Sequence, residues 1–293
     1  QANVVFDPTG KVAHPDTHVN LFGGLEIEPD PKGKCDLIKA HLYQLCNEDD
    51  NLYHWVICWL ALPLQQQGAK MRTSLIIHGR MEGTGKSLMM DIMRAIYGRY
   101  SRSITQVQLQ SEFNGWQSGM LLCVAEEVVS ASERKNLKNL IQNMITSAVV
   151  QINEKNMPVR EEASFANFVF LSNEQLPMLL NPTDRRYTVL QVERVHDEAY
   201  FQAIGQEMAE GGVAAFYHWL LNYDVGKFNE HTRPFETTAR TRLITLGMQP
   251  DQRFMTYWSL GHAGVPFATC TARDLYAVFR SWCRINGERF IAN

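Results

Sequence analysis

Several features that would place a sequence in a common class of proteins are missing here. The six cysteines form no CxxC pair, which argues against a zinc site and a disulfide scaffold and fits a reducing compartment. No apolar run reaches the roughly 18 residues of a membrane span, and no signal-peptide pattern is visible. We therefore expect a cytoplasmic protein that has no membrane partner. Four histidines lack the spacing of a metal site and are interpreted as structural or surface residues: His196, His218, His231 and His262.

An excess of charge of one sign is also missing. The formal net charge of the 293 residues is −3, so any contact with nucleic acid must come from a local groove or ring. Hydrophobic residues make up 45% and charged residues 20%, which is ordinary for a globular protein of one large domain or two modest ones. Because the chain begins with Gln1 rather than Met, we expect it to be part of a longer polypeptide.

The most informative stretch is residues 74–97, which read SLIIHGRMEGTGKSLMMDIMRAIY. An apolar strand, a glycine loop and an apolar-rich helix in this order predict a P-loop that binds ATP and Mg²⁺. The glycines let backbone N–H groups point at phosphate oxygens, Lys86 brings a charge to the β- and γ-phosphates, and the Ser87 hydroxyl can ligate Mg²⁺. The predicted nucleotide contacts are Gly83, Thr84, Gly85, Lys86, Ser87 and Leu88.

This loop departs from the usual motif in one respect. The motif has four residues between its first Gly and the Gly-Lys pair, whereas five lie between Gly79 and Gly85. Either Arg80 stands where the first Gly is expected, or the loop carries an insertion. The alternative, a glycine-rich turn before a buried helix, does not account for the agreement of strand, Gly-Thr-Gly-Lys-Ser and helix.

Acidic and amide side chains follow the next apolar strands. Residues 120–125 form an apolar run that ends in Glu126 and Glu127, the arrangement of a Walker B strand. The first carboxylate would hold the Mg²⁺ shell partly through water, and the second would polarise the attacking water. The strand predicted at 165–171 ends in Ser172-Asn173, and Asn173 could bridge the γ-phosphate and that water. In isolation, the acidic pair reads as a solvated strand end and Asn173 as a turn residue.

Two further elements carry basic residues. An amphipathic helix is predicted at 133–147, and a β-hairpin with strands 149–152 and 159–163 follows it, with Lys155 near the tip. Asp184-Arg185-Arg186 precedes a strand at 187–192. The arginines could pair with acidic neighbours, or one could stabilise the transition state in the next subunit of a ring. The hairpin tip could equally be a solvated surface turn.

The flanks read as follows. Residues 1–34 are an irregular arm that we expect to drape on a neighbour, 35–70 a small helical bundle, and 71–195 a P-loop ATPase core with a hairpin near 149–163. Residues 196–250 are a helical segment packing on the core, and 251–293 a small helical domain that could begin a winged helix. Within these segments, the first two predicted helices are 35–46 and 51–62, and Pro63 is expected to end the second, which carries Trp55 and Trp59 in the core. Residues 100–119 are predicted as a loop region. Further helices are predicted at 197–208, 213–221, 252–259 and 271–286.

The order of these parts resembles the superfamily 3 helicases, and most closely the helicase part of phage and plasmid primase–helicases of the poxvirus type. The resemblance covers most of the chain. Its most specific pieces are Gly-Thr-Gly-Lys-Ser and Asp-Arg-Arg, and its least specific is the hairpin. The departures are the extra loop residue and Glu126, where Asp is usual. The flanking stretches that share the resemblance are Asn20-Leu-Phe-Gly23, residues 55–65, Phe113-Asn-Gly-Trp116 and Asp274-Leu-Tyr276.

The resemblance implies an α/β fold, a P-loop ATPase core of the AAA+ type with a central, mostly parallel sheet and helices on both faces. It implies a hexameric ring that moves on single-stranded DNA through a central pore, with 35–70 as the helical collar or oligomerisation bundle and the hairpin near 149–163 in the pore. It also allows a primase domain upstream in the same polypeptide. The implied roles are nucleotide and Mg²⁺ binding by Lys86 and Ser87, a Walker B pair of Glu126 and Glu127, a sensor at Asn173, an arginine finger at Arg185 or else Arg186, and a nucleic-acid contact at Lys155.

Two functions stay open at this stage. The first is an ATP-driven helicase, and the second is a nucleotide-gated initiator or loader that assembles on DNA without processive unwinding. The acidic pair, the sensor and the finger serve both. A small-molecule kinase would share the P-loop, but it would explain neither an arginine pair acting in trans nor a pore hairpin.

Overall fold

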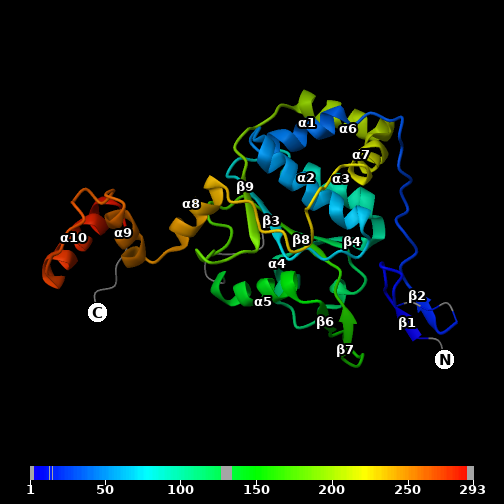
Figure 1. Cartoon of the computed structure of the whole chain (residues 1–293), viewed down its shortest axis with the longest axis horizontal. Helices are drawn as coiled ribbons and strands as arrows, with labels where there is room; N and C mark the ends of the chain where they lie inside the picture. Colours follow the sequence, from blue (N-terminus) through cyan, green and yellow to red (C-terminus); the bar gives the residue numbers. More distant parts are fainter. Residues whose placement is uncertain (1–2, 13, 15, 127–133, 289–293) are drawn as a thin grey trace.

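A five-stranded sheet with helices on both faces forms the centre of the molecule (Figure 1). The structure is a computed structural model, and it describes residues 3–12, 14, 16–126 and 134–288. A small lobe made of α9 (Pro250–Ser259) and α10 (Ala272–Ile285) projects to one side of this body in the same view. The expected α/β architecture with a central parallel sheet is confirmed.

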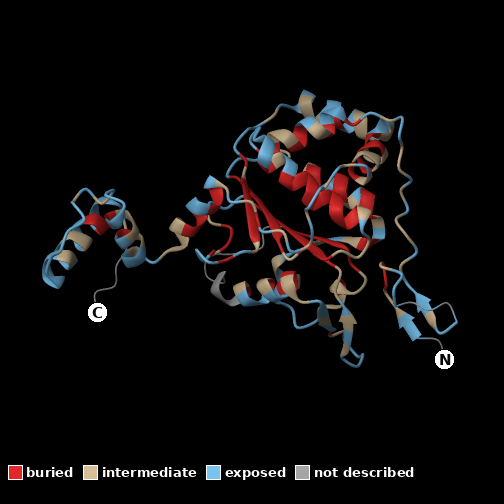
Figure 2. Ribbon diagram, viewed as in Figure 1, coloured by how far each residue is buried: buried red, intermediate tan, exposed pale blue. Residues whose placement is uncertain are grey.

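The sheet consists of β3 (Ser74–His78), β4 (Ser101–Ile104), β5 (Leu122–Glu126), β8 (Asn167–Ser172) and β9 (Tyr187–Gln191). Their order is β4-β5-β8-β3-β9, and every neighbouring pair is parallel. All residues of β3 and β8 are buried, as expected for central strands covered on both faces (Figure 2). Because the strands run in one direction, the segments that follow β3, β5 and β8 meet at the edge of the sheet that the carboxyl ends of the strands form.

Strand residues alternate between two cores. One core joins Leu75, Ile77, Val124 and Val169 to the helices α1 (Asp36–Leu45), α2 (Asp50–Gln65), α3 (Lys86–Tyr97), α6 (Glu198–Glu207) and α7 (Val213–Leu221). The other joins Ile76, Ala125, Phe168 and Val189 to α4 (Gln106–Gln110), α5 (Arg134–Thr146) and α8 (Thr238–Gly247). The helices predicted as a collar therefore share one core with the glycine-loop helix.

Helix α2 continues past the point at which it was predicted to end. Its N-cap is Asp49, whose carboxylate accepts from the N–H groups of Asn51 and Leu52. The expectation that Pro63 ends it is wrong, because the helix runs on to Gln65. A proline removes one hydrogen bond from a helix, but here the buried Leu64 keeps the last turn packed. The predicted burial of Trp55 and Trp59 is confirmed.

The arm and the region 100–119 hold more regular structure than expected. In the arm, β1 (Asn3–Val5) and β2 (His18–Asn20) pair in parallel. Phe6 and Phe22 pack on Tyr100 at ring-centroid distances of 5.6 and 4.9 Å, so the arm contacts its own chain. Region 100–119, predicted as a loop, contains β4 and α4. Strand β4 is an outermost strand of the sheet. Its sequence is SRSI, so it has little apolar pattern of its own.

The remaining elements lie near their predicted positions, apart from α8, which was not predicted. Strands β6 (Val149–Ile152) and β7 (Arg160–Ala163) form the expected antiparallel hairpin. Helix α10 begins as predicted at Thr271, whose hydroxyl oxygen accepts from the N–H of Asp274 at 3.1 Å. The short turns of helix are η1 (Gly98–Tyr100), η2 (Gly115–Gln117) and the π-turn η3 (Met208–Gly212).

Candidate nucleotide-binding site

A cavity of about 430 Å³ opens at the edge of the sheet where β5 and β8 end and α3 begins. It brings together four residues that the sequence singled out, Lys86, Ser87, Glu126 and Asn173. These residues come from three separate segments, and only the parallel sheet places them side by side. The remaining lining residues are Thr105, Gln106, Val107, Leu171 and Ser172.

The glycine loop connects β3 to α3, whose first residues, Lys86 and Ser87, line this cavity. Gly83 and Gly85 have φ angles of 70° and 79°, which favour glycine. Gly85 is the N-cap of α3, and among the described residues no side chain caps this helix end. The first N–H groups of α3 are thus available to an anion, and the positive end of the helix dipole favours one there.

The buried ammonium group of Lys86 folds back over the loop. Its Nζ donates to the carbonyl oxygens of Gly79 and Met81 at 3.3 and 3.2 Å, and to the Thr84 hydroxyl at 3.0 Å. These two carbonyls flank Arg80, which stands where the usual motif has its first Gly unless the loop carries an insertion. Burial lowers the pKa of Lys86 from its ordinary value. A phosphate oxygen would offer this buried cation a charged partner in place of neutral carbonyls.

Oxygen ligands suited to Mg²⁺ face the same cavity. Glu126 is exposed at the end of β5, and its Oε1 accepts from the Ser103 hydroxyl at 2.9 Å. The Ser87 hydroxyl and this carboxylate are the hard oxygen donors that Mg²⁺ takes when phosphates supply other ligands, so they fit the ion. Glu127, the predicted second carboxylate, lies outside the described residues. Within the described part of the chain, no cluster of three or more His, Cys, Asp or Glu side chains could hold a metal.

Arg185 and Arg186 lie at the opposite edge of the sheet, which the amino ends of the strands form. The N–H of Ser74, the first residue of β3, donates to the carbonyl oxygen of Arg186 at 2.7 Å. At about 3.3 Å per residue, the five residues of β3 separate this edge from the glycine loop by roughly 15 Å. Arg186 pairs with the buried Asp184 at 3.2 Å, whereas Arg185 is exposed and forms no ion pair with any described residue.

These two arginines line a second cavity of about 460 Å³. None of its lining residues is acidic, and three further members can carry positive charge, Arg72, His231 and Arg233. The structure therefore brings the twin arginines together with other basic groups, and it keeps them apart from the Lys86 cavity of the same chain. The remaining lining residues are Thr73, Thr146 and Thr232.

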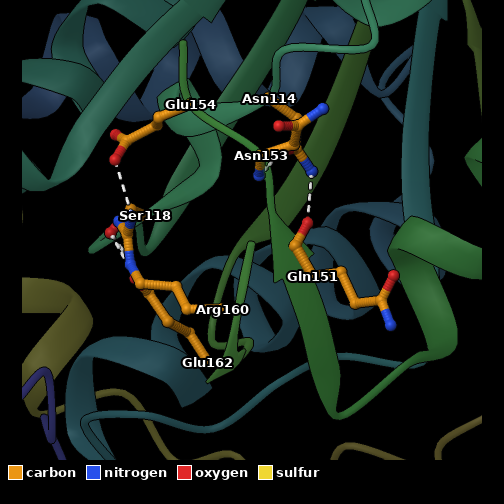
Figure 3. A network of polar contacts seen from close by, with 7 residues as sticks. All are labelled: Asn114, Ser118, Gln151, Asn153, Glu154, Arg160 and Glu162. Atoms are coloured by element: carbon orange, nitrogen blue, oxygen red, sulfur yellow. Dashed lines mark hydrogen bonds and ion pairs between the residues drawn. The ribbon is translucent and has the colours of Figure 1, made fainter. Parts of the chain in front are cut away.

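Lys155 is exposed in the turn of the β6–β7 hairpin, where Asn156 has a φ of 65°. The turn end of this hairpin is tied to the segment before β5 (Figure 3). Asn114 donates to the carbonyl oxygen of Gln151 and accepts from the N–H of Asn153, each at 2.7 Å. Arg160 bridges Glu154 and Glu162 at 2.6 Å each, and Ser118 donates to Glu162. Glu154 and Glu162 are thus paired with Arg160, while Lys155 is exposed in the same turn as Glu154.

Sequence reasoning missed the residues that hold the glycine loop from behind. His41 of α1 lies 3.0 Å from the carbonyl oxygen of Gly85, and the N–H of His196 donates to the carbonyl oxygen of Gly83 at 3.0 Å. His196 had been read as a structural or surface residue, and His41 had not been singled out. The segment between β9 and α6, which holds His196, and the helix α1 carry no local pattern that predicts these contacts.

Fold and site together define a parallel α/β protein in which the helix start after a glycine loop, a carboxylate and an amide share one cavity. The chain matches, over residues 77–186, a family described as a family of unknown function (DUF5906). It is 32% identical over 188 residues to the "DNA Primase-polymerase" of Nitratiruptor phage NrS-1, a match that covers 62% of this chain and 26% of that protein. The match thus spans about a quarter of the length of this curated relative.

Solved structures show the same fold. An apo structure of the NrS-1 C-terminal region superposes with a TM-score of 0.75 at 20% identity, covering 98% of this chain and 76% of that one. An A-form apo structure of that region gives a TM-score of 0.73 at 22% identity, covering 98% and 66%. None of the described helices is long and apolar enough to cross a membrane.

Proposed function

We propose that this chain is the ATP-driven motor of a phage or mobile-element replication protein, a P-loop ATPase of the AAA+ type and a superfamily 3 helicase. In this proposal it forms a ring, with six subunits as our first expectation, and moves on single-stranded DNA through the central pore. The observation that carries the proposal is the cavity shared by Lys86, Ser87, Glu126 and Asn173. The name of the related phage protein supports a setting in DNA replication, and a primase domain upstream in the same polypeptide would fit it.

The four residues that the sequence singled out each have a role in this mechanism, together with Glu127. Lys86 and the first N–H groups of α3 would hold the β- and γ-phosphates of ATP. Ser87 and Glu126 would hold Mg²⁺, partly through water, and the ion would neutralise charge on the phosphates. Glu127 would polarise the attacking water, and Asn173 would orient it against the γ-phosphate. Positioning and charge stabilisation supply most of the catalysis in phosphoryl transfer, so this set of groups is sufficient in kind.

The alternative is a nucleotide-gated initiator or loader that hydrolyses ATP without displacing a strand. The same cavity would serve it, and so would the projecting hairpin. A strand-displacement assay with ATP, Mg²⁺ and forked DNA separates the two functions. Strand displacement supports the helicase, whereas ATP hydrolysis without displacement supports the loader.

The first test of either proposal is the variant Lys86→Ala. Phosphates would lose the positioned side-chain cation of the loop, so we expect Mg²⁺–ATP binding to fall below detection and hydrolysis to be lost. Isothermal titration calorimetry and a phosphate-release assay measure the two effects. The matched control is Lys227→Ala, which removes an exposed lysine in the loop after α7. Wild-type hydrolysis in Lys86→Ala would rule out this cavity as the ATP site.

A further inference from the structure

His41 contacts the glycine loop from a helix far away in the sequence. Its Nε2 lies 3.0 Å from the carbonyl oxygen of Gly85, across a sequence separation of 44 residues. A carbonyl oxygen only accepts, so Nε2 carries the proton, and the lone pair of Nδ1 faces the Tyr200 hydroxyl at 3.0 Å. The His41 side chain is fully buried, and burial lowers its pKa. The imidazole is thus a neutral donor to the loop at neutral pH.

The peptide that His41 holds also carries an N–H group of the anion site. Gly85 and Lys86 share one planar trans peptide, so the N–H of Lys86 points away from the carbonyl of Gly85. His41 and the N–H of Met89 hold this carbonyl oxygen, the latter at 3.2 Å, and thereby set the direction of the Lys86 N–H. A hydrogen bond at a carbonyl also polarises its peptide, which strengthens the N–H as a donor.

His41 also packs directly against the Gly85–Lys86 peptide. A Cβ on Gly85 would lie 2.2 Å from Cε1 of the imidazole. The ring therefore fills the volume against which the loop closes. The Tyr200 hydroxyl lies 3.0 Å both from Nδ1 of His41 and from Oε1 of Gln44 on the same helix, so its one proton serves one of these two acceptors at a time.

We propose that His41 is a positioning residue of the nucleotide site: its Nε2–H orients the Gly85–Lys86 peptide so that the N–H of Lys86 faces a nucleotide phosphate. This inference rests on the proposed nucleotide binding at the loop. It makes affinity for nucleotide depend on how α1 packs against α3, so the predicted collar contributes directly to the ATP site.

The test measures binding of Mg²⁺–ADP by calorimetry in three variants. His41→Phe keeps the apolar volume but removes the donor, and we expect the affinity to fall about fivefold, the effect of losing one positioning hydrogen bond. His41→Gln places an amide N–H near Nε2 and should bind within about twofold of wild type. The control, His54→Phe, removes a similar histidine–tyrosine contact, His54 Nδ1 to the Tyr223 hydroxyl at 2.7 Å, in the neighbouring helix.

Each outcome decides the inference. Unchanged affinity in His41→Phe, or equal losses in His41→Phe and His41→Gln, would show that the ring acts through packing alone and would overturn it. Should His41→Phe fail to fold, His41→Asn replaces it. The amide of Asn is too short to reach Gly85, so the nucleotide affinity of His41→Asn should fall while that of His41→Gln is kept. If the wild-type chain binds no Mg²⁺–ADP, the proposed function fails first and this inference falls with it.

Discussion

Lys70 is a buried lysine whose partners are all neutral oxygens. Its Nζ donates to the carbonyl oxygens of Met144 and Ala166 at 3.1 and 2.8 Å, and to the Ser164 hydroxyl at 3.0 Å. The side chain thereby connects the end of α5 to the segment between the hairpin and β8. Burial lowers the pKa of Lys70 to about 7 from its ordinary value of 10.5. With no carboxylate among these partners, its charge state should influence stability.

We expect the stability of the wild type relative to Lys70→Met to rise with pH between about 7 and 10. In that window the unfolded chain holds the lysine proton and the folded chain releases it, so raising the pH favours folding. The slope would be at most about 1.4 kcal/mol per pH unit, and the difference should level off below pH ~7, where both states are protonated. Urea unfolding of both proteins at several pH values measures this difference.

The control for this experiment is Lys227→Met, an exposed position whose stability should track that of the wild type at every pH. At neutral pH, Lys70→Met should be less stable by about 1–3 kcal/mol, because two buried carbonyl oxygens lose their donor. Parallel pH curves for wild type and Lys70→Met would mean that Lys70 keeps the same charge in both states, against this account.

At the scale of elements, the turn of the β6–β7 hairpin is anchored to the rest of the chain and still carries exposed side chains. Asn114 and Asn153 join the start of the turn to the segment before β5, and the ion pair between Arg160 and Glu154 joins the turn to β7. Met157 and Val159 are 58% and 60% exposed, so the apolar side chains of the tip find little cover within the chain. A rigid support for one lysine suits a contact to a phosphate backbone better than a free loop does.

Lys155→Ala should weaken binding to single-stranded DNA regardless of sequence. Each phosphate neutralised in a single strand contributes about −0.7 to the slope of log affinity against log salt, so this slope should flatten. DNA-independent ATP hydrolysis should persist, because the tip is not among the residues that line the Lys86 cavity. Fluorescence anisotropy at several salt concentrations measures the slope, with Lys227→Ala as the control. An unchanged slope together with unchanged strand displacement would leave Lys155 as a surface residue.

At the scale of the whole molecule, the two cavities lie at opposite edges of one sheet. Lys86 follows the carboxyl end of β3, whereas Arg185 and Arg186 precede the amino end of β9. Within one chain they do not meet. In a head-to-tail ring, the surface of one copy meets a different surface of the next, so the arginine edge of one subunit can face the glycine loop of its neighbour.

Mixing two inactive variants tests this arrangement. Arg185→Ala should bind ATP normally but lose roughly 10³-fold in turnover, as expected for an arginine finger. Mixing it with Lys86→Ala should restore part of the activity, because an intact Arg185 then meets an intact loop. The matched control mixes Lys86→Ala with Asn173→Ala, two lesions of the same cavity, and here we expect no restoration because every subunit then carries a damaged cavity. Mixed rings without any recovery would place the finger at Arg186 or within the same chain.

The sequence by itself determined the elements whose signal is local. The apolar run of β3, the glycines and Gly-Lys-Ser predicted strand, loop and helix correctly, since a buried strand and a helix start have short-range patterns. The strand ends at Glu126 and near Asn173 were likewise readable. Their meeting in one cavity followed from the parallel direction of β5 and β8, which the βαβ pattern favours.

Only the tertiary structure decided the contacts that join distant segments. The edge strand β4 is held by β5 rather than by its own residues, and α2 passes Pro63 because its last turn is packed. His41 against Gly85 and Lys70 against Met144 depend on how helices dock, across sequence separations of 44 and 74 residues. The physical reason is that hydrophobic burial sets these positions, and the polar groups then pair with whatever the packing brings within reach.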